Sequence, residues 1–166
     1  ILSKEGRIPD GTKVLVIGGG VAGITAAAAA AMHGCKVQLV ERGPRLLHQF
    51  RGNTTRWLHP RIYDWPQAGS EELDAGLPLM NWTASVAGNV VEQLDKAWEQ
   101  LPKKDNVEIT CGQQRINFGQ YLHITWSESR GFKTPNPAIV ILATGFGVEA
   151  ELGNGVPHRS EERRVG

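Results

Sequence analysis

A glycine-rich turn at residues 18–23, with the pattern Gly-x-Gly-x-x-Gly, constrains the fold of this chain more than any other feature. It follows an apolar, β-branched run at residues 13–17 and leads into an Ala-rich run at residues 21–32. The first run is typical of a strand buried on both faces, and the second predicts a helix that ends at Gly34. Residues 36–41 predict another strand. This order of elements predicts a βαβ unit of a parallel sheet.

The same turn indicates a site for the phosphates of a nucleotide. Gly18 permits a tight turn, Gly20 lets the backbone approach a pyrophosphate, and Gly23 lets the helix pack closely against the strand. The free N–H groups and the positive dipole end of the helix then face the phosphates. Glu41, at the end of the second strand, can accept hydrogen bonds from both hydroxyls of a ribose. The residues expected to bind a dinucleotide are therefore Gly18, Gly19, Gly20, Val21, Ala22, Gly23, Glu41 and Arg42.

Two alternatives stay open at this point. The turn could serve only to connect a strand to a helix, in which case Glu41 is an ordinary surface carboxylate. Glu41 also disfavours a ribose 2′-phosphate, although the neighbouring Arg42 could accommodate one.

The composition argues against several other classes of protein. Lys and Arg number 18 and Asp and Glu 17, which gives a net charge of +1 and disfavours a polyanion-binding surface. The apolar stretch at residues 21–32 is too short to span a bilayer. Cys35 and Cys111 form neither a disulfide framework nor a redox or zinc motif, which fits a reducing, cytoplasmic compartment. We expect a small-molecule substrate, no metal site, and neither nucleic acid nor a membrane as a partner.

The rest of the chain is less regular. Residues 42–82 have no convincing period, although residues 51–66 concentrate arginine and aromatic side chains. Apolar residues recur at helical spacing over 86–101, and Thr83 or Ser85 is expected to cap this helix. Further strands are predicted at residues 107–110, 114–117, 121–127, 130–133 and 138–143.

Residues 14–42, with their three glycines and Glu41-Arg42, resemble the FAD-binding start of flavoproteins with two dinucleotide-binding domains. Ala143-Thr144-Gly145, at the end of an apolar run, is similar to the second motif of that family. The resemblance implies FAD as the cofactor and NAD(P)H as the co-substrate of the full protein. It also implies that residues 52–56 lie near the pyrophosphate and the isoalloxazine. The site residues that rest on the resemblance are Arg56, Ala143, Thr144 and Gly145.

The fold implied by the resemblance is α/β. It is a Rossmann-like, doubly wound parallel sheet with a small antiparallel β-meander layer, and we expect it to be incomplete in this chain.

The chain departs from the pattern of that family in two places. The family often has Gly-Gly soon after the acidic residue, whereas this chain has Gly43-Pro44. The paired redox cysteines of the disulfide reductases are absent, which argues against thiol chemistry. The sequence contains neither a Ser-His-Asp order nor a His-Glu-x-x-His motif, so no catalytic residue is identified.

The residues and the resemblance together predict the N-terminal FAD-binding part of a flavin-dependent oxidoreductase, inactive by itself. The alternatives are an NAD-dependent dehydrogenase domain and a non-catalytic nucleotide-binding module. We expect an N-terminal extension at residues 1–12, a truncated FAD-binding domain at 13–157 and a non-native tail at 158–166. The tail is expected because residues 159–166 resemble the translation of a sequencing-library adapter.

Overall fold

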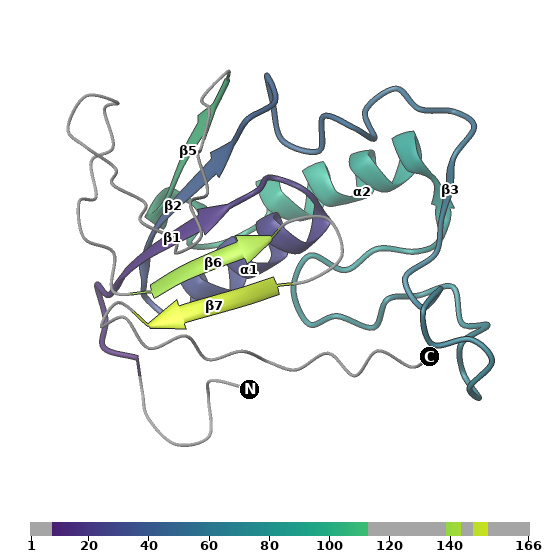
Figure 1. Cartoon of the computed structure of the whole chain (residues 1–166), viewed down its shortest axis with the longest axis horizontal. Coiled ribbons are helices and arrows are strands. Elements are labelled where there is room, and N and C mark those ends of the chain that lie inside the picture. The colour runs from purple at the N-terminus through teal and green to yellow at the C-terminus, as the bar shows by residue number, and fades with distance from the viewer. Residues whose placement is uncertain (1–7, 113–138, 144–147, 153–166) are drawn as a thin grey trace, which may run out of the picture.

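The computed structural model describes residues 8–112, 139–143 and 148–152 (Figure 1). Two helices and seven strands are assigned in these residues, together with one short 3-10 turn, η1. In chain order they are β1 (Lys13–Ile17), α1 (Val21–Met32), β2 (Lys36–Glu41), β3 (Trp57–Leu58), β4 (Ser85–Val86), α2 (Ala87–Glu99), η1 (Lys104–Asn106), β5 (Val107–Cys111), β6 (Ile139–Ala143) and β7 (Val148–Leu152).

The main sheet has the strand order β5-β2-β1-β6-β7. The first four of these strands are parallel, and β7 pairs antiparallel with β6. In the register of the sheet, Ile17 lies opposite both Val40 and Leu142, and Glu41 lies opposite Cys111. The carboxyl ends of β1, β2, β5 and β6 therefore meet at one edge. This arrangement confirms the predicted Rossmann-like α/β fold.

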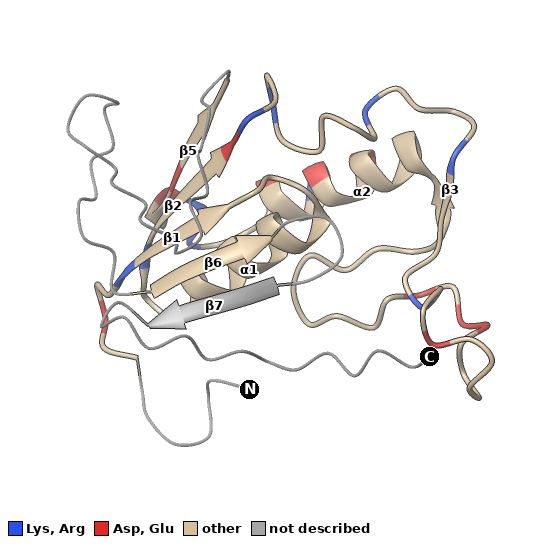
Figure 2. Ribbon diagram, viewed as in Figure 1, with Lys and Arg blue, Asp and Glu red and all other residues tan. Residues whose placement is uncertain are grey.

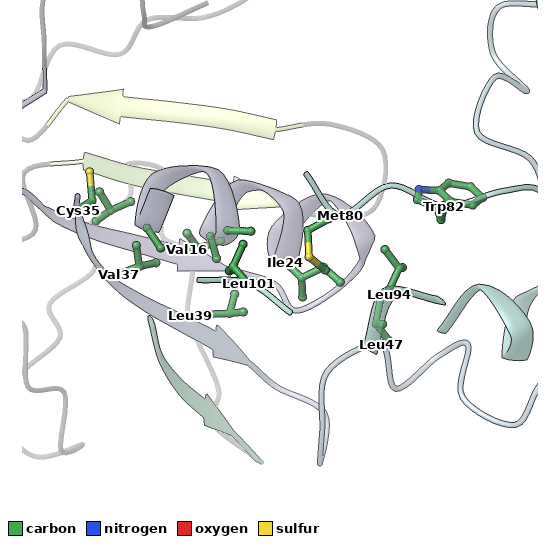
Figure 3. Packing of buried hydrophobic residues seen from close by; sticks show 14 of the residues in the cluster. Val16, Ile24, Cys35, Val37, Leu39, Leu47, Met80, Trp82, Leu94 and Leu101 are labelled. Carbon is green, nitrogen blue, oxygen red and sulfur yellow. The ribbon is translucent and has the colours of Figure 1, made fainter. Parts of the chain in front are cut away.

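α1 packs against one face of the main sheet, and buried residues of both α1 and α2 belong to the hydrophobic cluster on that side (Figure 3). Val16 of β1 and Leu39 of β2 are fully buried in this cluster, together with Leu94 of α2. The buried face of α1 consists largely of alanine, including Ala27 and Ala31, and these small side chains allow the helix to lie close to the strands. The Ala-rich sequence thus sets the distance between α1 and the sheet.

The opposite face of the sheet is also apolar and buried. Leu15, Ile17, Val40 and Leu142 form a second cluster there. β1 is therefore buried on both sides, as its continuous apolar sequence predicts. The β-meander was predicted on residues 114–133, which lie outside the described residues.

The predicted cap of the second helix is wrong. The helix begins at Ala87 after Val86, and its first turn has no side-chain cap. Instead, the N–H groups of Ala87 and Gly88 donate to the carbonyl oxygens of Arg56 and Asn53, at 2.8 and 2.9 Å. A backbone loop that is distant in sequence therefore satisfies the free donors that Thr83 or Ser85 was expected to bind.

The close approach of α1 to β1 can be tested at Gly23. A Cβ atom there would collide with the carbonyl oxygen of Gly18, so Gly23→Ala forces the backbone to move. We expect this change to lower the free energy of unfolding by about 1–3 kcal/mol, measured by urea denaturation. Gly20→Ala is the matched control, because nothing lies within 4 Å of a Cβ at Gly20, and its cost should stay below about 1 kcal/mol. Equal losses in the two variants would contradict this account.

Candidate nucleotide-binding site

The glycine turn connects β1 to α1 and is packed from behind by backbone atoms. Gly18 has a φ of +106°, a conformation that favours glycine, and a Cβ there would collide with the carbonyl oxygen of Ala143 at the end of β6. A Cβ at Gly19 would lie 2.6 Å from Leu46 Cδ2 and 2.9 Å from Glu41 Cβ. Among the glycines of this turn, only Gly20 has open space where a Cβ would lie. The turn is therefore closed on one side and open on the side where Gly20 lies.

The first turn of α1 leaves its amide donors available. Gly20 precedes the helix in an extended conformation and provides no side-chain cap, and no acidic residue lies in the first turn. An α-helix cannot pair its first N–H groups internally, and its N-terminus carries a partial positive charge. Val21 is half-buried and Ala22 is exposed at this end. An anion beside Gly20 would meet these donors directly.

The strand order places this turn at a switch point of the sheet. From β1 the chain passes to β2 on one side, whereas β6 pairs with β1 on the other side. In open α/β sheets, ligands bind at the carboxyl edge where the strand order reverses in this way. Both the fold and the local backbone therefore indicate the same binding position.

Glu41 ends β2 beside the glycine turn, and two backbone amides fix its carboxylate. The N–H of Gly19 donates to Oε2 at 2.6 Å, and the N–H of Gly43 donates to Oε1 at 2.7 Å. An ionised carboxylate has about four acceptor positions, so each oxygen can accept a further hydrogen bond. The arrangement can bind a ligand with two neighbouring hydroxyl groups.

Cys111 lies opposite Glu41 at the end of β5. Burial raises the pKa of its thiol, and the negative charge of Glu41 raises this pKa further. Gly112 follows, and its N–H donates to the carbonyl oxygens of Glu41 and Gly43 at 3.1 and 2.9 Å. The ends of β1, β2 and β5 are thus joined by hydrogen bonds around Glu41.

The loop after β2 is docked against the glycine turn. The N–H of Leu47 donates to the carbonyl oxygen of Gly19 at 2.8 Å, and the Leu47 side chain is buried. Arg51, further along this loop, makes a two-pronged ion pair with Asp95 of α2, at 2.7 and 2.8 Å. The hydrogen bonds that Arg51 donates to Asp95 raise the pKa of Arg51, which stays charged. Leu47 and Arg51 were not among the predicted site residues.

A polar cavity of about 350 Å³ lies between this loop and the first turns of α2. Its lining includes Arg45 and Asn53 from the loop and Gly88 and Asn89 from the helix. The same loop therefore contacts the glycine turn at Leu47 and borders a cavity lined by basic and amide side chains and by the acidic Glu92 of α2.

The remaining predicted site residues are placed as follows. Arg42 is exposed directly after Glu41, where Figure 2 shows basic residues beyond the acidic end of β2. Arg56 is exposed, with its guanidinium 5.2 Å from the centre of the Phe50 ring. In the described part of the chain, no hydrogen bond or ring contact joins Arg56 to the glycine turn. Ala143 is buried against the turn, and Thr144 and Gly145 lie outside the described residues.

Neither α1 nor α2 is long and apolar enough to cross a membrane. Within residues 8–112, 139–143 and 148–152 there is no group of three or more metal-ligating side chains.

The charge of Glu41 can be followed through the neighbouring thiol. Glu41→Gln removes the second cause of the raised pKa of Cys111, so this pKa should fall. In a Cys35→Ala background, the pH midpoint of Cys111 alkylation should shift to lower pH. At pH values below the pKa of Cys111, the alkylation rate of Cys111 should rise several-fold, because the thiolate is the reactive form. Glu92→Gln, on the exposed side of α2, is the control and should leave the midpoint in place. An unchanged midpoint in Glu41→Gln would show that the charge does not reach the thiol.

Comparison with known proteins gives the family of the chain. A family model described as FAD dependent oxidoreductase matches residues 13–119. Searches of curated proteins and of solved structures gave no match. The matched segment starts with β1 and contains the glycine turn, Glu41, the docked loop, α2 and β5. It covers more than half of the chain, and the chain therefore belongs to the FAD dependent oxidoreductase family.

Proposed function

We propose that the glycine turn and Glu41 bind the ADP half of FAD, and that the protein transfers a hydride or electrons between this flavin and a small-molecule substrate. The observation that carries the proposal is that the turn is open to solvent at Gly20 and closed at its other glycines. Neighbouring atoms occupy the space where a Cβ of Gly18, Gly19 or Gly23 would lie. The corresponding space at Gly20 is open, at the start of a helix without a side-chain cap. Such a cradle fits a pyrophosphate.

The residues of this chain have separate roles in the proposal. The first-turn amides of α1 stabilise the negative charge of the pyrophosphate, and Gly20 lets the phosphate oxygens come close to the backbone. Glu41 accepts hydrogen bonds from the ribose hydroxyls with the lone pairs that Gly19 and Gly43 leave free. When bound, the flavin supplies the site that accepts and donates the hydride.

The loop at residues 45–56 is the proposed route toward the flavin. Its hydrogen bond to Gly19 and its place along the polar cavity support this position. Arg56 would contribute a cation there, and Ala143, Thr144 and Gly145 would also contribute to the binding site. Arg42 would lie at the outer side of the ribose. NADH or NADPH as the reductant of the full protein, and a cytoplasmic location, belong to the same proposal.

The proposed cradle is tested by FAD binding to a variant that fills it. Gly20→Val places a branched side chain where the phosphate would lie, and we expect FAD binding to fall below detection in a flavin-fluorescence titration. Lys103→Ala changes an exposed residue behind the other end of α1 and should bind FAD like the wild type. Equal FAD affinity in wild type and Gly20→Val would reject the turn as the binding site.

A competition titration separates FAD from the NAD alternative. FAD and NADH share an ADP half, so any preference arises from the other half of the molecule. We expect FAD to displace NADH from the wild-type chain and NADH to displace FAD only at much higher concentration. The reverse order would favour an NAD-dependent dehydrogenase domain.

A further inference from the structure

Three backbone N–H groups hold the end of β2 in place. The N–H groups of Gly19 and Gly43 bind the two oxygens of the Glu41 carboxylate, as described above. The N–H of Gly112 binds the main-chain carbonyls of Glu41 and Gly43. The donors come from the segments that follow β1, β2 and β5. The orientation of one carboxylate therefore depends on three separate strand ends.

The N–H groups of Gly19, Gly43 and Gly112 together form a clamp around Glu41. This clamp matters because a glutamate side chain is flexible. A free Glu side chain loses rotamer freedom when it binds a ligand, and that loss weakens binding. In this structure the two hydrogen bonds to the carboxylate have already fixed it, and both oxygens keep acceptor capacity for a ligand. The side chain is thus ordered before any ribose arrives.

Gly43 and Gly112 are suited to the clamp for different reasons. A Cβ at Gly43 would lie 3.1 Å from both Glu41 Oε1 and His48 Cβ, so glycine lets its amide approach the carboxylate. Gly112 has a φ of +133° with nothing within 4 Å of a Cβ. The requirement at Gly112 is therefore its backbone conformation and not the space around it.

We propose that Gly43 and Gly112 are positioning residues that orient Glu41 for the vicinal ribose hydroxyls of an adenosine nucleotide. This inference rests on the proposed function, which assigns Glu41 to the ribose. It adds that ribose recognition depends on the turn at residues 41–43 and on the hydrogen bonds that join this turn to Gly112 after β5.

The test compares ADP with 2′-deoxy-ADP by calorimetric titration of the full chain. Wild type should prefer ADP by about tenfold or more, because the missing hydroxyl removes a hydrogen bond to a charged group. Glu41→Ala should abolish this preference. Gly43→Pro, which removes the amide proton, and Gly112→Ala, which strains the backbone, should each reduce the preference to about threefold or less. Their affinity for 2′-deoxy-ADP should stay within about twofold of wild type, because this probe lacks the hydroxyl that reports on the orientation of Glu41.

Gly11→Ala is the matched control for Gly112→Ala. Gly11 also has a positive φ, +78°, with nothing within 4 Å of a Cβ, but it precedes β1 at the opposite edge of the sheet. This variant should keep the full preference for ADP. If Gly43→Pro does not fold, Gly112→Ala alone decides the outcome.

The possible results separate the two proposals. A preference that Glu41→Ala loses and both glycine variants keep overturns the positioning role and leaves the proposed function standing. Equal losses of affinity for both nucleotides in the glycine variants show a general structural role and also overturn it. No binding of ADP by wild type overturns the proposed function and this inference together.

Discussion

The contact between the backbones of Gly18, Gly23 and Ala143 is the constraint on which the rest of the structure depends. Three segments meet there with only the methyl group of Ala143 as a neighbouring side chain: the end of β1, the first turn of α1 and the end of β6. A single Cβ at either glycine would separate helix from strand or strand from strand. Because the contact is so close, the first turn of α1 lies directly against the ends of β1 and β6.

From this contact the polar features of the site follow. β2 pairs with β1 in a register that brings Glu41 beside Gly19, and β5 pairs with β2 in a register that brings Gly112 beside Gly43. The site therefore combines an electropositive helix end with a fixed carboxylate a short distance along the same edge. The two charges suit two parts of one ligand, an anionic pyrophosphate and a neutral ribose diol. The third part of the ligand, the flavin, is indicated by the family to which the chain belongs.

The sequence was most informative where the determinants of structure are local. The apolar run of β1, the glycines, the alanines of α1, and Gly34 with its φ of +83° all lie within one short segment. Their positions predict the βαβ unit and the place of Glu41. The loop after β2 could not be predicted in this way. Its position depends on the pairing of Arg51 with Asp95, 44 residues away in the chain, and on Leu47, a non-glycine residue with a φ of 56°. Neither feature leaves a periodic pattern in the sequence.

The prediction of the helix cap was wrong for the same reason. The first N–H groups of α2 donate to carbonyl oxygens of a distant loop and not to a neighbouring side chain. The role of Gly43 was also hidden. In the sequence it appears only as a departure from the Gly-Gly pattern of the flavoproteins, whereas in the structure its amide orients Glu41. Backbone donors carry no residue-specific signal, so a clamp made of three amides becomes visible only when the strands are placed side by side.

In the proposed site, the chain binds a dinucleotide by its ADP half. The most direct measurement is a displacement titration of bound FAD with ADP and, separately, with FMN, which carries the flavin and one phosphate but no adenosine. We expect ADP to displace FAD and FMN to leave FAD bound. Displacement by FMN together with no effect of ADP would contradict the proposed site, because the glycine turn and Glu41 would then not be where the cofactor is bound.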